Sequence, residues 1–402
     1  MLIKNNNYVP MDISTSFSSN PSTSGAITQA IASLHQKIIN PKLILVYFSE
    51  NYEVETLQRA LTAAFPFAQI LGSTSCQGVM TDAGYHQGTG VALWAISDYD
   101  GAYGSAIVAS QRPKYEMARQ ALLKAIANSG RPGELPSLII LHASPGDEED
   151  VIRGINDELG VSVPIIGGSA ADDFIQGNWH IFTHEQTCQE GVGLSVIYPS
   201  CHISYSFHSG YASTGLSAIA TRVDDRELLE LDGRPAIEVY EEWMKERLSQ
   251  GKNLAKSSSL NPLGRVAGHI HDMPYFKLAH PREITQRGGI KLFAQIKKGE
   301  TLYFMNGTDE RLITRAGRVV DAACHIDADH NLLQPIGGIT IYCAGCMLRV
   351  QDRMDEVAAH VNHAMHEAPF VSPFTFGEQG QFEGGENAHG NLMISAVLFH
   401  KD

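Results

Sequence analysis

The stretch LILVYFSENYEVETLQRAL (residues 43–61) sets the pattern of the fold. Its first six residues are apolar and rich in β-branched and aromatic side chains, which is typical of a strand buried on both faces. In the residues that follow, Val54, Leu57 and Leu61 recur at helical spacing and predict a helix over 53–65. A strand that leads directly into a helix is the basic unit of layered α/β structure.

The same alternation continues through the first half of the chain. Apolar runs and helical patterns predict, in order, a strand, a helix, a strand and a helix at 91–96, 115–128, 137–142 and 151–159. Three strand-like runs then follow without helices between them, at 179–182, 192–197 and 202–207. We therefore predict an α/β fold with mixed sheets, arranged as a layered helix/sheet sandwich.

The length of 402 residues favours two associated α/β domains, because single hydrophobic cores stop growing below about 300 residues. The first 25 residues are rich in Asn and Ser, so we interpret residues 1–25 as a flexible arm. The composition changes near Ala220, where a strand-like stretch leads to Gly233 and a helix. We place the first domain at 26–220 and the second at 221–402.

Composition excludes several classes of protein. A formal net charge of −14, with no basic stripe interleaved with aromatic residues, argues against a nucleic-acid partner. No apolar run reaches the roughly 18 residues that a membrane-spanning helix needs, so no membrane association is expected. Six scattered cysteines indicate a reducing compartment, and we expect the protein to be cytoplasmic.

A Cys-x-x-Cys motif lies in the segment GGITIYCAGCMLR (residues 337–349), where a predicted strand runs into a helix. Thiolates of Cys343 and Cys346 suit zinc or an iron–sulfur cluster, but such sites normally need four ligands. Small buried residues at a tight turn explain the motif equally well. The histidines of the next helix, at 360, 363 and 366, fall off its apolar face and are interpreted as solvated.

Two glycine-containing segments present polar groups at strand ends. In PIIGGSAADD (164–173), Gly167 and Gly168 precede Asp172 and Asp173, which either bind a cation or a ligand amine or cap a turn. In the second segment, residues 374–395, Glu378 and the HGN sequence from His389 to Asn391 lie on either side of a glycine-rich loop. That loop either closes over a pocket or is an ordinary hairpin.

Enzyme signatures are weak. The segment GSTSCQG at 72–78 does not have the G-x-S-x-G spacing of a nucleophile elbow, and no G-x-x-x-x-G-K-[ST] phosphate loop occurs. We therefore do not expect an enzyme. An enzyme that uses Cys343 or Cys346 as its nucleophile remains a third hypothesis, since it requires a neighbouring base.

Several of these segments, taken in order, resemble the FIST family, in which an N-terminal and a C-terminal region are paired. The matching segments are LILVYFSENYEVETLQRAL, ILGSTSCQGVM, PIIGGSAADD, IYCAGCMLR, PFTFGEQGQF and HGNLMIS. The resemblance implies a small-ligand sensor in intracellular signal transduction, with a histidine kinase or other signalling protein as its partner. It is compatible with a homodimer.

A free-standing subgroup of the family is similar in carrying the CAGC segment, and it includes nitric-oxide sensors that bind haem. This implies a haem-based nitric oxide or redox sensor, with haem b as the cofactor and an iron–sulfur cluster as the alternative. The expected axial ligand of a pentacoordinate haem is either His208, in FHSGY, or His389, in AHGNL, since each lies in a family-like motif. The chain departs from many members at Cys346, where another residue is common.

The alternative is a cofactor-free receptor for a small polar metabolite such as an amino acid. Its polar contacts are expected from Asp172, Asp173, Arg349, Glu378 and Asn391. In either version, the CAGC and HGN segments are predicted to lie together at a crevice formed by glycine-bent strand ends.

Overall fold

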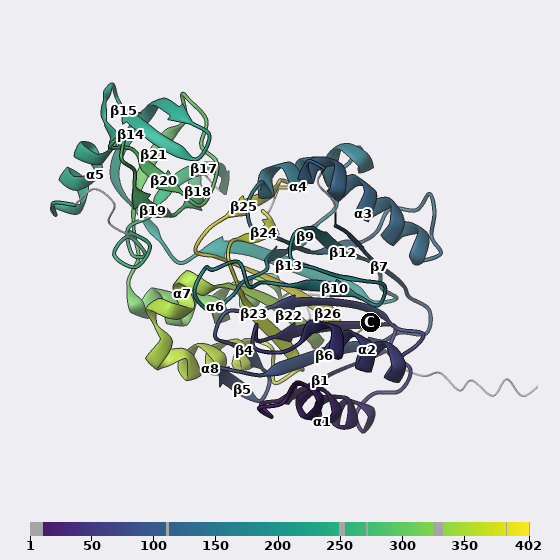
Figure 1. Ribbon diagram of the computed structural model, residues 1–402. Helices are drawn as coiled ribbons and strands as arrows, with labels where there is room; N and C mark the ends of the chain where they lie inside the picture. The colour runs from purple at the N-terminus through teal and green to yellow at the C-terminus, as the bar shows by residue number, and fades with distance from the viewer. Residues whose placement is uncertain are drawn as a thin grey trace, which may run out of the picture.

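The computed structural model describes residues 11–109, 112–248, 254–270, 272–324, 333–382 and 384–401. This part of the chain contains three six-stranded mixed sheets and one eight-stranded sheet (Figure 1). The predicted mixed α/β fold is confirmed.

The three six-stranded sheets are built from three similar units. The first unit consists of β1 (Asp12–Ser18), α1 (Thr23–His35), β2 (Leu43–Phe48), α2 (Val54–Ala64), β3 (Gln69–Thr74) and β6 (Val91–Ser97). The second consists of β7 (Ala102–Val108), α3 (Lys114–Asn128), β8 (Leu138–Ala143), α4 (Glu148–Leu159), β9 (Ile165–Ser169) and β12 (Val192–Tyr198). The third consists of β13 (His202–Ser209), α6 (Asp309–Ala323), β22 (Pro335–Cys343), α7 (Ala344–Arg349), α8 (Met354–Ala364), β23 (Phe370–Thr375) and β26 (Met393–His400).

Strand order is the same in each unit: β1-β6-β2-β3, β7-β12-β8-β9 and β13-β26-β22-β23. The last two strands of each series are parallel, whereas the other neighbours are antiparallel. The core is therefore an internal threefold repeat of one βαβαββ arrangement, and its helices lie on the outside of the body (Figure 1).

Hairpins exchanged between the units lock them together. The hairpin β4 (Gly78–Thr81)–β5 (Gly84–Gln87) follows β3 but pairs with β23 of the third unit. The hairpin β10 (Ile181–Thr183)–β11 (Thr187–Cys188) follows β9 but pairs with β3 of the first unit. The hairpin β24 (Glu378–Gln381)–β25 (Asn387–Gly390) follows β23 but pairs with β9 of the second unit. The exchange is cyclic, so each sheet is completed by another unit.

The core sheets are buried on both faces, as the apolar runs predict. All six residues of β2 are buried. Leu45 packs with Ile140 and Ile339 in a cluster that all three units share, whereas Val46 packs under α1 and α2. Each fully buried leucine of this kind contributes about 1.5–3 kcal/mol. The shared cluster holds the three strand ends in fixed positions around the centre.

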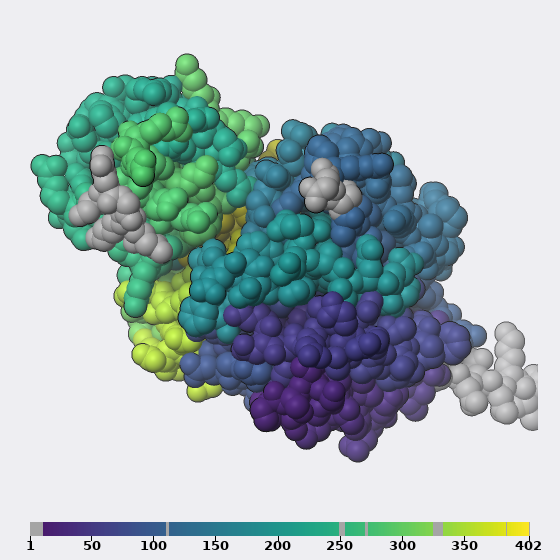
Figure 2. Space-filling model, in the orientation of Figure 1, coloured from purple at the N-terminus to yellow at the C-terminus, as the bar shows by residue number. Residues whose placement is uncertain are grey.

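A separate lobe is inserted between β13 and α6. It consists of β14 (Ala212–Asp224), β15 (Glu227–Leu231), β16 (Arg234–Pro235), α5 (Ala236–Met244), β17 (Leu263–Ile270), β18 (Met273–Ala279), β19 (Pro281–Ile284), β20 (Ile290–Leu292) and β21 (Thr301–Asn306). It has its own hydrophobic cluster, which includes Leu228, Tyr240, Leu263 and Leu302. Figure 2 shows it as a distinct body beside the core.

The boundary expected between residues 220 and 221 lies inside β14. Of the expected arm, residues 1–10 lie outside the described residues, and residues 12–18 form β1, which pairs with β6. Within the described ranges, no helix is both long enough and apolar enough to cross a lipid bilayer.

Candidate functional site

The segments that follow β3, β9 and β23 meet at the centre of the core. The amide of Ala171 donates to the carbonyl of Thr74 at 3.3 Å, and the amide of Cys76 donates to the carbonyl of Phe374 at 3.1 Å. A third hydrogen bond, from the amide of Phe376 to the carbonyl of Ser169 at 3.1 Å, links the third unit to the second. The threefold arrangement therefore brings three polar strand ends to one place.

The CAGC and HGN segments lie side by side, as predicted. Cys343 ends β22. The backbone of Leu392 lies close enough to the Cys343 thiol to influence its pKa. A Cβ atom added at Gly345 would lie 3.0 Å from Leu392 Cδ2 and 3.7 Å from His280 Cε1. Since His280 belongs to the lobe, the lobe covers both segments.

Further bonds fasten the lobe to the HGN segment. Asn391 Oδ1 accepts from the His280 amide at 3.1 Å, and the Asn391 amide donates to the Leu278 carbonyl at 3.1 Å. Leu278 also belongs to the same hydrophobic cluster as Cys343 and Leu392. We call this group, formed by residues 343–346, Glu378, residues 389–392 and the lobe residues 278–280, the junction.

Glu378 is a fully buried carboxyl group in the junction. Its Oε1 accepts from the Thr375 hydroxyl at 3.1 Å and from the Gly377 amide at 3.2 Å, and its Oε2 accepts from the Met393 amide at 3.0 Å. Burial raises its pKa well above the usual range, and the neighbouring Cys343 thiol raises the pKa further. The thiol and the carboxyl group are therefore direct neighbours.

His389 is buried with an unpartnered ring nitrogen. Only 3% of the residue is exposed. Gln379 Nε2 lies 3.4 Å from His389 Nδ1. Among the described residues, neither His389 Nε2 nor Gln379 Oε1 has a hydrogen-bond partner. Buried polar groups without partners are rare in folded proteins and often mark functional positions.

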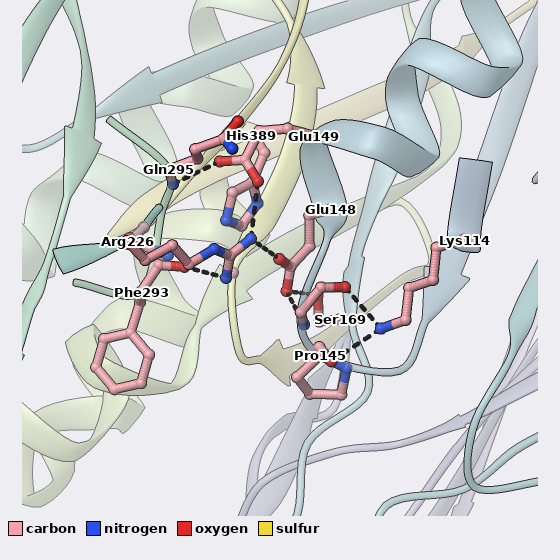
Figure 3. Close-up of polar contacts among 12 residues, drawn as sticks. Lys114, Pro145, Glu148, Glu149, Ser169, Arg226, Phe293, Gln295 and His389 are labelled. Carbon is pink, nitrogen blue, oxygen red and sulfur yellow. Dashed lines mark hydrogen bonds and ion pairs between the residues drawn. The ribbon is translucent and has the colours of Figure 1, made fainter. Parts of the chain in front are cut away.

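Next to His389, an ion-pair cluster connects the second unit to the lobe (Figure 3). Arg226, in the turn between β14 and β15, reaches Glu148 at 2.6 Å and Glu149 at 2.7 Å through the same nitrogen. The Gln295 amide of the lobe donates to Glu149 Oε1 at 2.8 Å. We call the contacts of Arg226 and Gln295 with these two carboxylates the latch.

The latch is held largely out of solvent. The side chains of Arg226 and Glu148 are 14% and 4% exposed. Burial alone raises the pKa of Glu148, but the charges of His389 and Arg226 outweigh it and lower the pKa to about 2. Ser169 and the Gly146 amide donate to Glu148 Oε1 at 3.0 and 2.8 Å. Glu148 is therefore a fully ionised carboxylate at neutral pH.

Lys114, at the start of α3, fixes the loop before α4. Its Nζ donates to the carbonyls of Ser144, Pro145 and Gly146 at 2.6, 2.8 and 2.6 Å. Burial lowers the pKa of Lys114. Sequence reasoning missed Lys114 and Arg226, because nothing in their local sequence indicates partners about 30 and 78 residues away.

Gly167, Gly168, Asp172 and Asp173 form the strand end of the second unit. Gly168 and Gly167 pair with Glu378 and Gln379 of β24, and a Cβ atom at Gly168 would lie 2.4 Å from Thr375 Oγ1. Asp172 accepts four backbone amides, from residues 175–178, at 2.5–2.9 Å. Asp173 accepts from the Gln77 amide at 2.7 Å, and burial raises its pKa. The turn-capping interpretation accounts for Asp172.

Arg349 and His208 lie outside the junction. Arg349 forms an ion pair with Asp309 at 2.7 Å, and its side chain is about one-third exposed. His208 follows Phe207, which packs against Gly380 next to the junction. Alternate strand residues face opposite sides, so His208 faces away from it, toward Arg315, and burial lowers its pKa to about 4. Of the polar residues proposed for a metabolite pocket, Glu378 and Asn391 lie in the junction, whereas Arg349 is paired with Asp309.

Residues that fit the implied cofactors are not brought together. In the described ranges, no three His, Cys, Asp or Glu side chains are arranged to hold a metal ion. A Cβ atom at Gly377 would lie 2.5 Å from His389 Cε1, so backbone closes over that ring where a porphyrin would have to lie. His208 lies on β13 and His389 on β25, and these strands belong to two different sheets. In this conformation the site does not fit haem or an iron–sulfur cluster.

Comparisons with known proteins identify the family. Residues 42–234 match the FIST N domain, and residues 236–381 match the FIST C domain. The chain therefore belongs to the FIST family, whose domains are sensor modules of signal transduction. The two matches do not follow the spatial units, since the FIST N match includes the start of the lobe.

More distant similarities were also found. An uncharacterized protein of Methanocaldococcus jannaschii is 25% identical over 159 residues, which are 39% of this chain and 29% of that protein. The chain thus spans less than a third of that relative. The crystal structure of a cyanuric acid hydrolase from A. caulinodans aligns over 98% of this chain and 100% of that chain, with 10% identity and a TM-score of 0.39. A second cyanuric acid hydrolase structure, 8% identical, has a TM-score of 0.36 over 97% and 99% of the two chains. At these TM-scores the similarity carries no conclusion about this chain.

Proposed function

We propose that this protein is a cytoplasmic sensor in which the junction receives the signal and the inserted lobe reports it to a partner histidine kinase. The family supports the sensor role, and the kinase partner is carried over from the resemblance. Six free cysteines are consistent with a reducing compartment. We propose no catalytic turnover.

One observation carries the proposal: the lobe contacts the core residues of the junction directly. Besides the bonds of Asn391 to His280 and Leu278, the hydroxyl of Tyr211 donates to the Ser259 carbonyl at 2.6 Å and lies 3.9 Å from Cys346 Sγ. Any change at these sulfur and backbone atoms alters the contacts that position the lobe. A signal can shift the lobe only by favouring one of its positions over another.

Haem is not part of this proposal, because His389 is enclosed and His208 faces away from it. The junction is also closely packed: Cys343, Cys346 and Leu392 are all buried in one hydrophobic cluster. A stimulus that acts there must therefore be small or must change the chemistry of the residues already present. Both kinds of signal are compatible with a family of sensors.

Hydrogen-exchange mass spectrometry tests the proposal. The protein is exposed separately to a nitric oxide donor, hydrogen peroxide and each of the amino acids. We expect at least one probe to change exchange in residues 278–280 and 389–392 together, and in the rest of the lobe. In Asn391→Ala, which removes the acceptor for His280, the response of the lobe should be weakened.

Two results would overturn it. One is that no probe alters exchange at residues 389–392. The other is that a probe alters exchange in the core while the lobe stays unchanged.

A further inference from the structure

The two cysteines of the CAGC segment are positioned to form a bond with each other. Cys343 is the N-cap residue of α7, and Cys346 is the third residue of that helix. N-cap and N3 side chains are neighbours, as they are in a capping box. Both side chains are buried in the same hydrophobic cluster. A disulfide therefore needs little backbone movement.

The surroundings of this thiol pair supply a proton acceptor and exclude large molecules. Glu378 neighbours the Cys343 thiol, which contributes to the raised pKa of its carboxyl group, and Thr375 and two backbone amides hold the carboxyl group in place. Cys343 and Cys346 are 5% and 1% exposed. Only a small reagent reaches the sulfur atoms while the lobe stays in place.

We propose that Cys343 and Cys346 are a reversible dithiol–disulfide centre, oxidised by small hydroperoxides, with Glu378 as the proton acceptor. The redox centre names the signal that the proposed sensor detects. The effect of oxidation on signalling rests on the proposed function. A covalent change of this kind needs no cavity, which suits the packed junction.

The reaction is balanced as follows. Glu378 takes the proton of Cys343, and the thiolate attacks one oxygen of the hydroperoxide, so that the O–O bond breaks and the alcohol, or water from hydrogen peroxide, leaves with a proton. Cys343 becomes a sulfenic acid. The Cys346 sulfur then attacks it, and water leaves as the disulfide forms. Two thiols lose two electrons and two hydrogens, and the peroxide gains them. A dithiol reductant reverses the change.

Glu378 suits this role because burial raises its pKa well above the usual carboxyl range. A carboxylate with a raised pKa binds the proton released by a thiol more strongly than an ordinary carboxylate does. Burial also raises the pKa of the Cys343 thiol, so the thiolate forms only with the help of a base. Rapid oxidation of this pair therefore depends on the carboxyl group.

Oxidation has a direct route to the lobe. Tyr211 contacts both Cys346 and the Ser259 carbonyl of the lobe. When the Cys346 sulfur turns to bond Cys343, its contact with the Tyr211 hydroxyl is lost. The reduced and oxidised forms then differ in how firmly the lobe is held.

Differential alkylation tests the proposal on the full chain. Fully reduced protein is treated with hydrogen peroxide, free thiols are blocked under denaturing conditions, and the cysteine pairing is mapped by mass spectrometry. We expect the first disulfide to join Cys343 and Cys346 and to disappear with dithiothreitol. In Cys346→Ser, oxidation should stop at a sulfenic acid on Cys343, trapped by dimedone.

Glu378→Gln should slow disulfide formation on the order of 100-fold, while Cys188→Ser, a matched control, should oxidise at the wild-type rate. If Glu378→Gln does not fold, the wild-type rate must still rise with pH and level off once the carboxyl group is ionised. The proposal is overturned if both thiols stay reduced, or if the first disulfide involves Cys76 or Cys188.

Failure of this inference is distinguishable from failure of the proposed function. If the disulfide forms but hydrogen exchange in the lobe does not change, the redox centre stands and reporting by the lobe is wrong. If another probe changes exchange across the junction while both thiols stay reduced, the sensor stands and the redox centre is wrong.

Discussion

Two strand ends of the core touch the lobe, and they occupy equivalent positions in different units. The segment after β8 carries Glu148 and is fixed by Lys114 and by the ion pairs of the latch. The segment after β22 carries the CAGC thiols, of which Cys346 lies 3.9 Å from the Tyr211 hydroxyl, and the adjoining HGN segment adds neutral hydrogen bonds to the lobe. The lobe is thus held by ion pairs at the latch and by weaker contacts at the CAGC segment. It can rotate about the latch when the contacts at the CAGC segment change.

Breaking the latch should have the largest effect on stability. Arg226→Ala leaves the buried carboxylate of Glu148 without its cation, and we expect a loss of about 3–5 kcal/mol in the free energy of unfolding. Urea denaturation followed by tryptophan fluorescence measures it. Arg349→Ala is the matched control, since its ion pair with Asp309 is more exposed and should cost about 1 kcal/mol or less. Equal effects would show that the latch is not an anchor.

Removing the lysine that fixes the loop should have the next largest effect. Lys114→Met keeps the length of the side chain but removes three charge-assisted hydrogen bonds, so we expect a loss of about 2–3 kcal/mol. The exposed Lys124 on the same helix provides the control Lys124→Met, for which no measurable loss is expected. Thermal unfolding of both variants checks this. A Lys114→Met protein as stable as wild type would remove the distinction between the two strand ends.

The pH dependence of stability should reveal Glu378. Its pKa is raised in the folded state, so the unfolded chain releases this proton first. As the pH rises from the pKa of Glu378 in the unfolded chain toward its pKa in the folded protein, ionisation of the unfolded chain lowers the free energy of unfolding. The loss is at most about 1.4 kcal/mol per pH unit. From pH 5 to pH 7, the free energy of unfolding should therefore decrease by about 1–2 kcal/mol less in Glu378→Gln than in the wild-type protein. Parallel stability curves for the two proteins would contradict this environment for Glu378.

Much of the fold was predictable from local sequence. The predicted strand at 43–48 coincides with β2, because an apolar run of that length suits a strand buried on both faces. His360 and His363 are exposed on α8, as helical spacing predicted, and His366 is exposed just after that helix ends. The threefold repeat was not found, because the lobe of residues 212–306 interrupts the third unit and the exchanged hairpins pair with strands far away in sequence.

The site was only partly predictable. The glycine-bent strand ends did indicate that CAGC and HGN lie together. Glu148 and Glu149 lie in the first turn of α4, where carboxylates complement the helix dipole. Their pairing with Arg226 could not be inferred, since it depends on how the lobe docks. The enclosure of His389 likewise depends on Gly377, a contact that sequence spacing does not reveal.

The most direct test of the account measures whether the state of the junction positions the lobe. Fluorophores placed at the exposed residues Lys124 on the core and Lys298 on the lobe report the distance between the two bodies by energy transfer. We predict one transfer efficiency for the reduced protein and a different one after peroxide treatment, with the reduced value restored by dithiothreitol. The same efficiency in both forms, with the Cys343–Cys346 disulfide verified, would contradict the claim that the lobe reports the state of the junction.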